Sequence, residues 1–313
     1  MNSIWLIIKK HMWSYVFIIP MFLLFIAFTF YPLMASAYYT FFNWDGIGVP
    51  ADFVGFKNYI NIASDPFFWN AFKNTIIYTV ILVPIQVSLA LLLATVLNSK
   101  WLKARYIFGA IFFLPVVSTA AIVGIVVSIL ISVGGKNINA ILINFGFINS
   151  SIDWLGDHRT ALGLIILVGV WISLGYPIIY FLAALQSVKQ ELYDAAMLDG
   201  ANALKLFWYI TLPSIRPIFF VILFITTLYS LRVFDIIQTM TRGGPYYATD
   251  VVSTYIYRMA FYTTERGEAF ARIGYASAAA FFLGLLIMGI SIFQFIAIRY
   301  LYKQRSEGKF INR

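Results

Sequence analysis

Four side chains within one apolar stretch have the chemistry of a binding site. They recur at intervals of four, three and four residues: Gly169, Ser173, Tyr176 and Tyr180. At those intervals the four residues lie along one face of a helix. Tyrosine rings can stack on the apolar face of a ligand ring, and hydroxyl groups can exchange hydrogen bonds with ligand hydroxyls. The same residue types also serve as close contacts between helices, so packing is the competing interpretation.

Further polar residues interrupt other apolar stretches. Those that join the first four as candidates for a ligand pathway are Ser118, Thr119, Thr226, Tyr229 and Ser230. Two more, Asn74 and Gln86, lie in an earlier apolar stretch. A polar side chain at such a position usually faces the interior of a helix bundle, where it finds a partner or lines a pathway. We expect Tyr176 to be the central ligand contact.

Residues for catalysis or metal binding are scarce. The chain has no cysteine, and its two histidines, His11 and His158, are far apart in the sequence, which leaves too few ligands for a zinc-type site. The nearest match to a phosphate-binding loop is Gly134-Gly135-Lys136-Asn137, which lacks the first glycine and the hydroxyl residue that would hold magnesium. We expect no enzyme activity, no ATP hydrolysis and no cofactor in this chain.

The elements that carry the candidate residues are predicted to be transmembrane helices. Hydrophobic residues make up 61% of the 313 residues and charged residues 11%, whereas soluble domains have about 25% charged residues. A helix needs about 20 apolar residues to cross the hydrocarbon core of a membrane. We expect a single all-α integral membrane domain over 1–313, with spans at about 15–42, 74–97, 107–133, 162–186, 212–231 and 275–300.

The basic residues predict the orientation of these spans. With a cytoplasmic amino terminus, the inside segments hold 13 of the 22 Lys and Arg residues and 4 acidic residues, so the whole net charge of +9 lies inside. An excess of positive charge in short inside loops is the usual determinant of topology. We therefore expect a multi-pass protein of a bacterial cell membrane with both termini in the cytoplasm. The basic balance indicates contact with anionic membrane lipids and no nucleic-acid partner.

One inside segment predicts a helix that does not cross the membrane. Residues 190–207 have apolar side chains at helical spacing but too little hydrophobicity to span. Glu191 and Asp194 fall in its first turns, near the positive end of the helix dipole. Gly200 then permits a sharp bend. The segment is either a helix offered to another protein or an amphipathic linker on the membrane surface.

Ordered matches along the chain resemble one family. The run Asp194-Ala195-Ala196, followed by Gly200 and Ile210-Thr211-Leu212-Pro213, looks like the EAA loop of permeases from binding-protein-dependent ABC importers. The chain is most similar to the carbohydrate group of that family, which includes the maltose-transporter permeases. Other segments that resemble this group are Phe68 through Thr75, Phe113-Leu114-Pro115, Leu182 through Gln186, Phe234-Asp235, Thr241 through Thr249 and Gly274 through Ala278.

The resemblance implies a type I ABC importer permease fold, with six transmembrane helices and a cytoplasmic coupling helix at about 190–207. In that family the EAA loop docks on a cytoplasmic ATPase. The residues implied in this coupling are Glu191, Asp194, Ala195, Ala196, Asp199, Gly200, Leu212 and Pro213. The implied partners are a second homologous permease, two ATPase subunits that bind ATP and magnesium, an extracellular or periplasmic solute-binding protein, and a sugar or oligosaccharide substrate.

The predicted function is import of a sugar or oligosaccharide by alternating access. A phosphorylated polyol such as glycerol phosphate is an alternative, although it would need a cationic cavity that the sister subunit would have to supply. An ion-coupled secondary transporter is a second alternative, which would need carboxylates within the membrane. The spans contain no Asp or Glu at mid-depth. Arg232 and Asp235, three residues apart, are either a structural ion pair, which we predict, or substrate contacts.

Overall fold

The described part of the chain is almost entirely helical. A computed structural model describes residues 11–99, 105–261, 264–265, 268–269 and 271–306. Contacts between Cα atoms divide the chain into two compact units, which we call unit 1 (Met1–Asp65 with Ile256–Leu283) and unit 2 (Pro66–Tyr255 with Gly284–Arg313). All candidate ligand and coupling residues belong to unit 2.

Unit 1 begins with one long apolar helix. The elements of this unit are α2 (Met12–Phe25), the π-turn η1 (Ile26–Phe30), α3 (Tyr31–Tyr39), α4 (Lys57–Ser64), the end of α14 (Val252–Phe261), the antiparallel strands β1 (Thr264–Glu265) and β2 (Glu268–Ala269), and the start of α15 (Ile273–Ser306). The first three helices continue without a break over 28 residues. They bury no residue, so an apolar surface faces outward all round, as in a span that meets lipid.

Three hydrogen bonds, donated by two residues, hold the connection after α3. Asn58 of α4 donates to the carbonyls of Thr40 at 2.8 Å and Phe42 at 3.0 Å. The N–H of Gly274, at the start of α15, donates to the carbonyl of Trp44 at 3.1 Å. A side chain at Gly274 would overlap the Phe42 carbonyl. Only glycine therefore allows α15 to begin this close to the connection.

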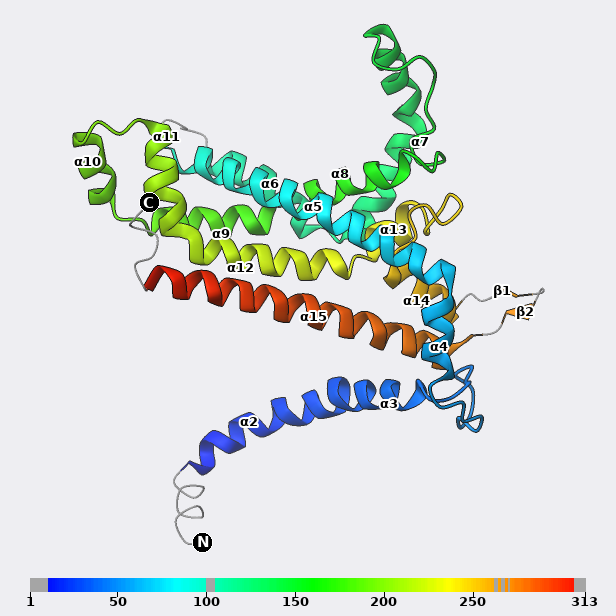
Figure 1. Cartoon of the computed structure of the whole chain (residues 1–313). Coiled ribbons are helices and arrows are strands. Elements are labelled where there is room, and N and C mark those ends of the chain that lie inside the picture. The colour runs from blue at the N-terminus through cyan, green and yellow to red at the C-terminus, as the bar shows by residue number, and fades with distance from the viewer. Residues whose placement is uncertain (1–10, 100–104, 262–263, 266–267, 270, 307–313) are drawn as a thin grey trace. The chain divides into compact units, whose positions relative to one another are not determined.

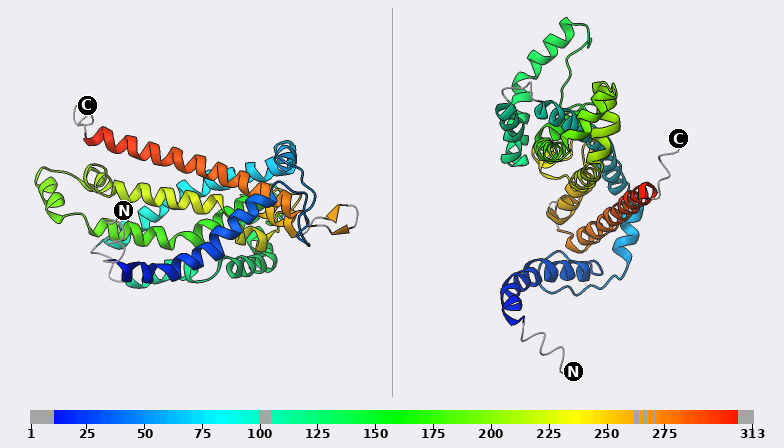
Figure 2. Two further views of the ribbon diagram at one scale, coloured as in Figure 1. Left: turned by 90° about the horizontal axis from the view of Figure 1, so that it is seen from below. Right: turned by 90° about the vertical axis from the view of Figure 1, so that its left-hand side faces the viewer.

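Unit 2 is a bundle built around one long helix. Its elements are α5 (Pro66–Asn98), α6 (Arg105–Val117), α7 (Ala120–Asn144), α8 (Ala161–Ser173), α9 (Gly175–Gln186), α10 (Gln190–Leu198), α11 (Ala203–Leu206), η2 (Phe207–Thr211), α12 (Leu212–Leu231), α13 (Asp235–Met240), the start of α14 and the end of α15. Helix α5 packs against α8, α9 and α12 (Figure 1). The small buried residues Ala90 and Ala94 of α5 let its neighbours approach closely. Helices α10 and α13 lie at opposite ends of this bundle (Figures 1 and 2).

The structure divides the third expected span, 107–133. Helix α6 ends at Val117 and α7 begins at Ala120, so the apolar stretch holds two helices. Thr119 between them has an extended backbone, and its hydroxyl accepts the N–H of Ile122 at 3.4 Å. A threonine in this role starts a new helix. Pro115 also removes one backbone donor in the turn before the break.

The fourth expected span, 162–186, is also divided. Helices α8 and α9 meet at Leu174 with a bend of 45°. Pro177 offers no N–H to the carbonyl of Ser173, which would be its partner in a continuous helix. Gly175 lies against α6, where a Cβ atom would be 2.6 Å from the Cγ2 atom of Val116. The bend falls within the stretch from Gly169 to Tyr180 that carries the candidate binding face.

The non-spanning helix is shorter than the expected 190–207. Helix α10 covers Gln190–Leu198 and is followed by a turn, after which α11, η2 and α12 continue as one apolar helix. Gly200 in the turn has a φ angle of +77°, a left-handed conformation that glycine adopts without strain. Asn202 then starts α11 by accepting the N–H of Lys205 at 2.9 Å. These two residues end the helix nine residues before the expected boundary.

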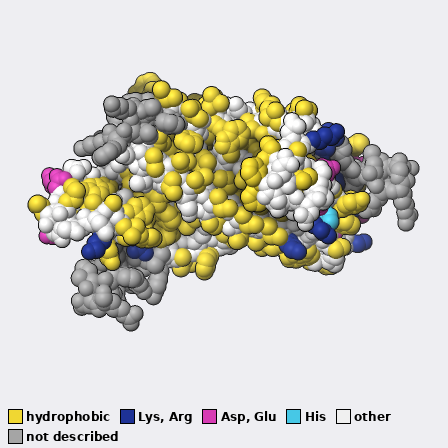
Figure 3. All heavy atoms as spheres, turned by 90° about the horizontal axis from the view of Figure 1, so that it is seen from above, with side chains coloured by type: hydrophobic (Ala, Val, Ile, Leu, Met, Phe, Trp, Pro, Cys, Tyr) yellow, Lys and Arg dark blue, Asp and Glu magenta, His cyan; other side chains and the backbone are white. Residues whose placement is uncertain are grey.

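Five described helices are long and apolar enough to cross a membrane, and the bent pair α8–α9 makes a sixth candidate span. The other five are Met12–Tyr39, Pro66–Asn98, Ala120–Asn144, Ala203–Met240 and Ile273–Arg299. Hydrophobic side chains cover most of the face seen in Figure 3, and the charged side chains on that face gather toward its two ends. This distribution is typical of a protein whose middle contacts lipid and whose ends contact water.

Candidate functional site

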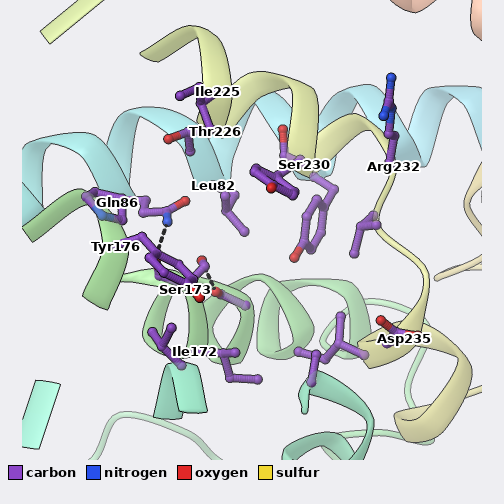
Figure 4. Close-up of a pocket in the computed structure, with 18 of the residues that line it drawn as sticks. Leu82, Gln86, Ile172, Ser173, Tyr176, Ile225, Thr226, Ser230, Arg232 and Asp235 are labelled. Carbon is purple, nitrogen blue, oxygen red and sulfur yellow. Dashed lines mark hydrogen bonds between the residues drawn. The ribbon is translucent and has the colours of Figure 1, made fainter. Parts of the chain in front are cut away.

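A cavity of about 680 Å³ opens in unit 2 at the bend between α8 and α9 (Figure 4). Side chains from α5, α8, α9 and α12 line it, together with the α6–α7 junction and the segment that leads into α13. Its volume lies within the range of about 300–1,000 Å³ that is usual for small-molecule sites. Among the lining residues that the structure describes, only Arg232 and Asp235 carry a charge. The interior of the cavity is therefore apolar and neutral polar.

The structure brings eight of the nine predicted pathway residues into this cavity. They are Gly169, Ser173, Tyr176, Tyr180, Ser118, Thr226, Tyr229 and Ser230. Tyr176 and Tyr180 of α9 and Tyr229 of α12 are exposed, whereas Thr226 and Ser230 are buried. The four residues chosen by helical spacing and four of those chosen as polar residues in apolar stretches therefore line one space, to which several helices contribute. The ninth residue, Thr119, does not line the cavity and instead caps α7.

The bend itself positions the aromatic and hydroxyl groups. The hydroxyl of Ser173 donates to the carbonyl of Gly169 at 2.5 Å, across the last turn of α8. The ring of Tyr176 meets the ring of Phe113 edge to face, with 5.9 Å between centroids and 88° between planes. This arrangement is favourable for aromatic pairs and holds the Tyr176 ring in one orientation. The bond of Ser173 leaves its oxygen able to accept from a ligand.

Two further residues of α5 line the cavity: Tyr78, which the sequence analysis missed, and Gln86, which it noted only as a polar residue in an apolar stretch. Tyr78 is buried and lies against Gly169, where a Cβ atom would overlap the Tyr78 hydroxyl. Gln86 is 3% exposed, and its amide nitrogen donates to the carbonyl of Ser173 at 2.6 Å. A signal for Gln86 was present, because it is an amide in an otherwise apolar stretch. No sequence pattern connects it with Ser173, which is 87 residues away.

The predicted ion pair between Arg232 and Asp235 is wrong. Both side chains line the cavity, but Figure 4 shows them pointing in different directions, and no salt bridge joins them. The spacing of three residues suggested a shared helical face. In the structure Arg232 caps the end of α12, Phe234 has a non-helical backbone, and Asp235 begins α13. Separate helices therefore carry the two charges.

The Asn74 side chain bonds to a loop and does not line the cavity. Its amide nitrogen donates to the carbonyls of Tyr247 at 3.2 Å and Asp250 at 2.9 Å. The loop contains three non-glycine residues with left-handed backbones, Arg242, Tyr246 and Tyr247, a conformation that costs free energy unless neighbouring contacts hold it. This loop, residues 241–250, is therefore an ordered surface anchored on α5.

The predicted coupling residues lie in two places. Helix α10 and its following turn hold Glu191, Asp194, Ala195, Ala196, Asp199 and Gly200. All but the half-buried Ala196 are exposed, and Leu198 beside them is 90% exposed. The hydroxyls of Tyr193 in α10 and Thr211 in η2 lie 2.9 Å apart. This bond ties the exposed helix to the base of α12.

The other two predicted coupling residues, Leu212 and Pro213, begin α12. They line a separate, mostly apolar hollow of about 1010 Å³ between α5 and α12. Arg216 borders this hollow, with its guanidinium 5.5 Å from the ring centroid of Phe220. Leu212 and Pro213 therefore shape the base of α12 and do not share the exposed surface of α10.

Comparisons with known proteins agree with this architecture. Residues 59–306 match the family described as binding-protein-dependent transport system inner membrane component. The probable ABC transporter permease protein YurN of Bacillus subtilis is 33% identical over 281 residues, which covers 90% of this chain and 94% of the relative. The lactose transport system permease protein LacF of Rhizobium radiobacter is 32% identical over 288 residues, or 91% and 94% of the two chains.

Solved structures give the same result. A chain from a bacterial ABC transporter involved in import of the acidic polysaccharide alginate superposes with a TM-score of 0.79 at 26% identity, over 95% of this chain and 98% of the other. The alginate transporter in complex with its pentasaccharide-bound periplasmic protein gives a TM-score of 0.78 at 26% identity, over 93% and 95%. The fold, the apolar helices and the match over most of its length show that the chain belongs to the family of binding-protein-dependent transport system inner membrane components, the permeases of ABC transporters.

Proposed function

We propose that this chain is a permease subunit of an ABC importer that carries a neutral sugar or oligosaccharide into the cell. The observation that carries this proposal is the cavity at the α8–α9 bend, where three tyrosine rings share one space with three hydroxyl groups. These residues are Tyr176, Tyr180, Tyr229, Ser173, Thr226 and Ser230. Sugars present apolar ring faces and many hydroxyls, so this combination matches their surface.

The names of the relatives support the substrate class. They include transporters of lactose, of multiple sugars and of arabinooligosaccharides. The solved structure belongs to an importer of alginate, which is also a carbohydrate but an acidic one. A relative named for sn-glycerol-3-phosphate is 28% identical. A phosphate group is best bound by several cationic donors. Arg232 is the one basic residue among the described side chains that line the cavity, and it lies at the α12–α13 connection. The lining therefore favours a neutral ligand.

The proposed link to ATP is helix α10. A separate ATPase, which holds ATP and magnesium, would dock on its exposed residues, of which Leu198 is the most exposed apolar side chain. The bond between Tyr193 and Thr211 would pass movement of α10 to α12, whose other half lines the cavity. Closure of two ATPase subunits would thereby open the cavity toward the outside, and their separation would open it inward. This is alternating access driven by ATP.

The remaining partners follow from exposed surfaces. A second, homologous permease would cover the open side of the cavity, where Tyr176 and Tyr229 are exposed. A periplasmic or extracellular solute-binding protein would deliver the sugar to the end of unit 2 that carries the 241–250 loop, opposite α10. A complex of this kind with a periplasmic protein exists for the structural neighbour. This arrangement requires cytoplasmic termini, in agreement with the distribution of basic residues.

Transport by the reconstituted complex tests the proposal. The chain carries an affinity tag, the complex is purified from its native membrane, and uptake into proteoliposomes is measured for labelled lactose, arabinotriose and glycerol 3-phosphate. The expected result is co-purification of a second permease and an ATPase, with sugar uptake that requires ATP on the ATPase side. Uptake of glycerol 3-phosphate alone would change the substrate class. Sugar uptake driven by an ion gradient without ATP would overturn the proposal.

A further inference from the structure

The bend between α8 and α9 leaves one backbone acceptor without its usual partner. In a continuous helix the carbonyl of Ser173 would accept the N–H of the residue four positions later. That residue is Pro177, which has no N–H. The amide nitrogen of Gln86 fills the place by donating to the Ser173 carbonyl at 2.6 Å. A side chain of α5 thus completes the hydrogen bonding of the bent helix pair.

This bond fixes the orientation of the Gln86 amide. A backbone carbonyl only accepts hydrogen bonds, so the nitrogen of the amide must face Ser173 and the oxygen must face away. Figure 4 shows Gln86 reaching from α5 to the bend, with its oxygen turned toward the space between the lining residues. The Gln86 side chain is 3% exposed, and its oxygen has no hydrogen-bond partner within the described chain. It is a buried, oriented acceptor on a residue that lines the cavity.

A buried acceptor without a partner carries a cost that a suitable ligand removes. Such a group has given up its hydrogen bond to water without gaining another, and a donor that reaches it compensates for this loss. An amide oxygen attracts a hydroxyl and repels a carboxylate or phosphate oxygen. Because Gln86 is locked by Ser173, it cannot rotate to offer its nitrogen to an anion. The group that satisfies it must be a hydrogen-bond donor, such as a sugar hydroxyl.

We propose that Gln86 determines substrate specificity by accepting a hydrogen bond from one hydroxyl group of the transported sugar. This inference rests on the proposed function, because it assigns a residue within the same cavity. It adds a polar contact from α5, beside the aromatic and hydroxyl contacts from α9 and α12. It also assigns Pro177 a role in specificity, since the missing N–H of the proline orients the amide.

The test compares a sugar with its single-hydroxyl deletions. ATP-dependent uptake of lactose and of its monodeoxy derivatives is measured for wild type and for Gln86→Leu, in the complete complex. We expect wild type to discriminate against one monodeoxy derivative by about twofold to tenfold, as for one neutral hydrogen bond. In Gln86→Leu this discrimination is expected to disappear for that one hydroxyl and to persist for all other hydroxyls of the sugar. The variant should change KM and leave kcat unchanged.

A second variant separates recognition from a structural role. Pro177→Ala gives the Ser173 carbonyl a backbone donor, so Gln86→Leu in that background leaves no helix carbonyl unpaired and should assemble even if the single variant does not. If Gln86 only stabilises the bend, the double variant will discriminate like wild type, or all derivatives will weaken equally, and the inference is overturned. Loss of discrimination at one hydroxyl in the double variant supports it. Absence of sugar transport by wild type would instead refute the proposed function, on which the inference depends.

Discussion

Gly169 of α8 lies directly against the hydroxyl of Tyr78 in α5, so that no side chain fits at residue 169. A Cβ atom there would overlap the Tyr78 hydroxyl and lie 3.1 Å from the Cδ1 atom of Leu82. Both helices line the cavity at this contact. The close approach therefore sets the distance between α5 and α8, and with it the width of the cavity.

Gly169→Ala is expected to destabilise the protein. The added methyl group must push Tyr78 or separate the helices, which costs about 1–3 kcal/mol in a packed interior. We expect the melting temperature in detergent to fall by about 5 °C. Gly163→Ala is the matched control, because Gly163 lies on the same helix and a Cβ atom added there would meet no other atom within 4 Å. That control should be neutral or slightly stabilising, and an equal loss in both variants would contradict the assignment.

Removal of the Tyr176 ring is expected to weaken sugar binding. Tyr176→Leu removes the aromatic face that is held by Phe113 and exposed in the cavity. An aromatic contact contributes about 0.5–1.5 kcal/mol beyond area burial, so KM for the transported sugar should rise about twofold to tenfold. Trp171→Leu is the control, since Trp171 lies on α8, is 47% exposed and does not line the cavity. Equal effects of the two changes would show that Tyr176 acts only in packing.

Local patterns in the sequence predicted the membrane fold. Hydropathy identified the apolar stretches, and the comparisons confirm an all-α ABC permease fold. Hydropathy did not predict the helix break at Ser118 and Thr119. It is averaged over about the length of a span, so two polar residues that end one helix and begin another hardly change it. The same limitation hid the end of α10, where Gly200 and Asn202 decide the boundary through backbone angle and capping. Length and apolarity therefore indicate a span, while single residues divide it.

The candidate site was predictable where residues close in the sequence carry it. Tyr176 and Tyr180 share the cavity because helical spacing places them on one side of α9, and Ser173 joins them from the end of α8. Gln86 was not predictable as their neighbour, because its bond to Ser173 joins two helices across 87 residues. The prediction of an Arg232–Asp235 ion pair was wrong for a related reason. A spacing of three residues implies contact only when one helix continues between the two residues. Contacts within a helix follow from the sequence, whereas contacts between helices require the fold.

The 241–250 loop is expected to depend on Asn74. Asn74→Ala leaves the buried carbonyl of Asp250 without this donor, which costs about 1–3 kcal/mol. The loop residues with left-handed backbone conformations would then lose one of the contacts that stabilise them. We expect faster hydrogen exchange of the loop amides and a lower affinity for the solute-binding protein, with ATPase association unchanged. Asn137→Ala, at an exposed position on α7, is the control, and equal exchange in both variants would show that the loop is held by other contacts.

The last prediction concerns the link to the ATPase. Leu198 is 90% exposed at the end of α10, so Leu198→Asp should leave the fold and the melting temperature unchanged. If α10 docks in a groove of the ATPase, a charge at this apolar contact must be buried without a partner, which is strongly unfavourable. We expect the ATPase to be lost from the purified complex and sugar uptake to fall at least tenfold.

The control for this prediction is Val49→Asp, an aliphatic residue of unit 1 that is 86% exposed and lies in the connection after α3. It introduces the same charge at similar exposure but away from α10 in the sequence. The complex with this variant should retain the ATPase and take up sugar at the wild-type rate. Loss of the ATPase from both variants would indicate a general effect of added charge on assembly. Retention of full uptake by Leu198→Asp would show that α10 is not the docking element, and the hollow lined by Leu212 and Pro213 would then be the next surface to alter.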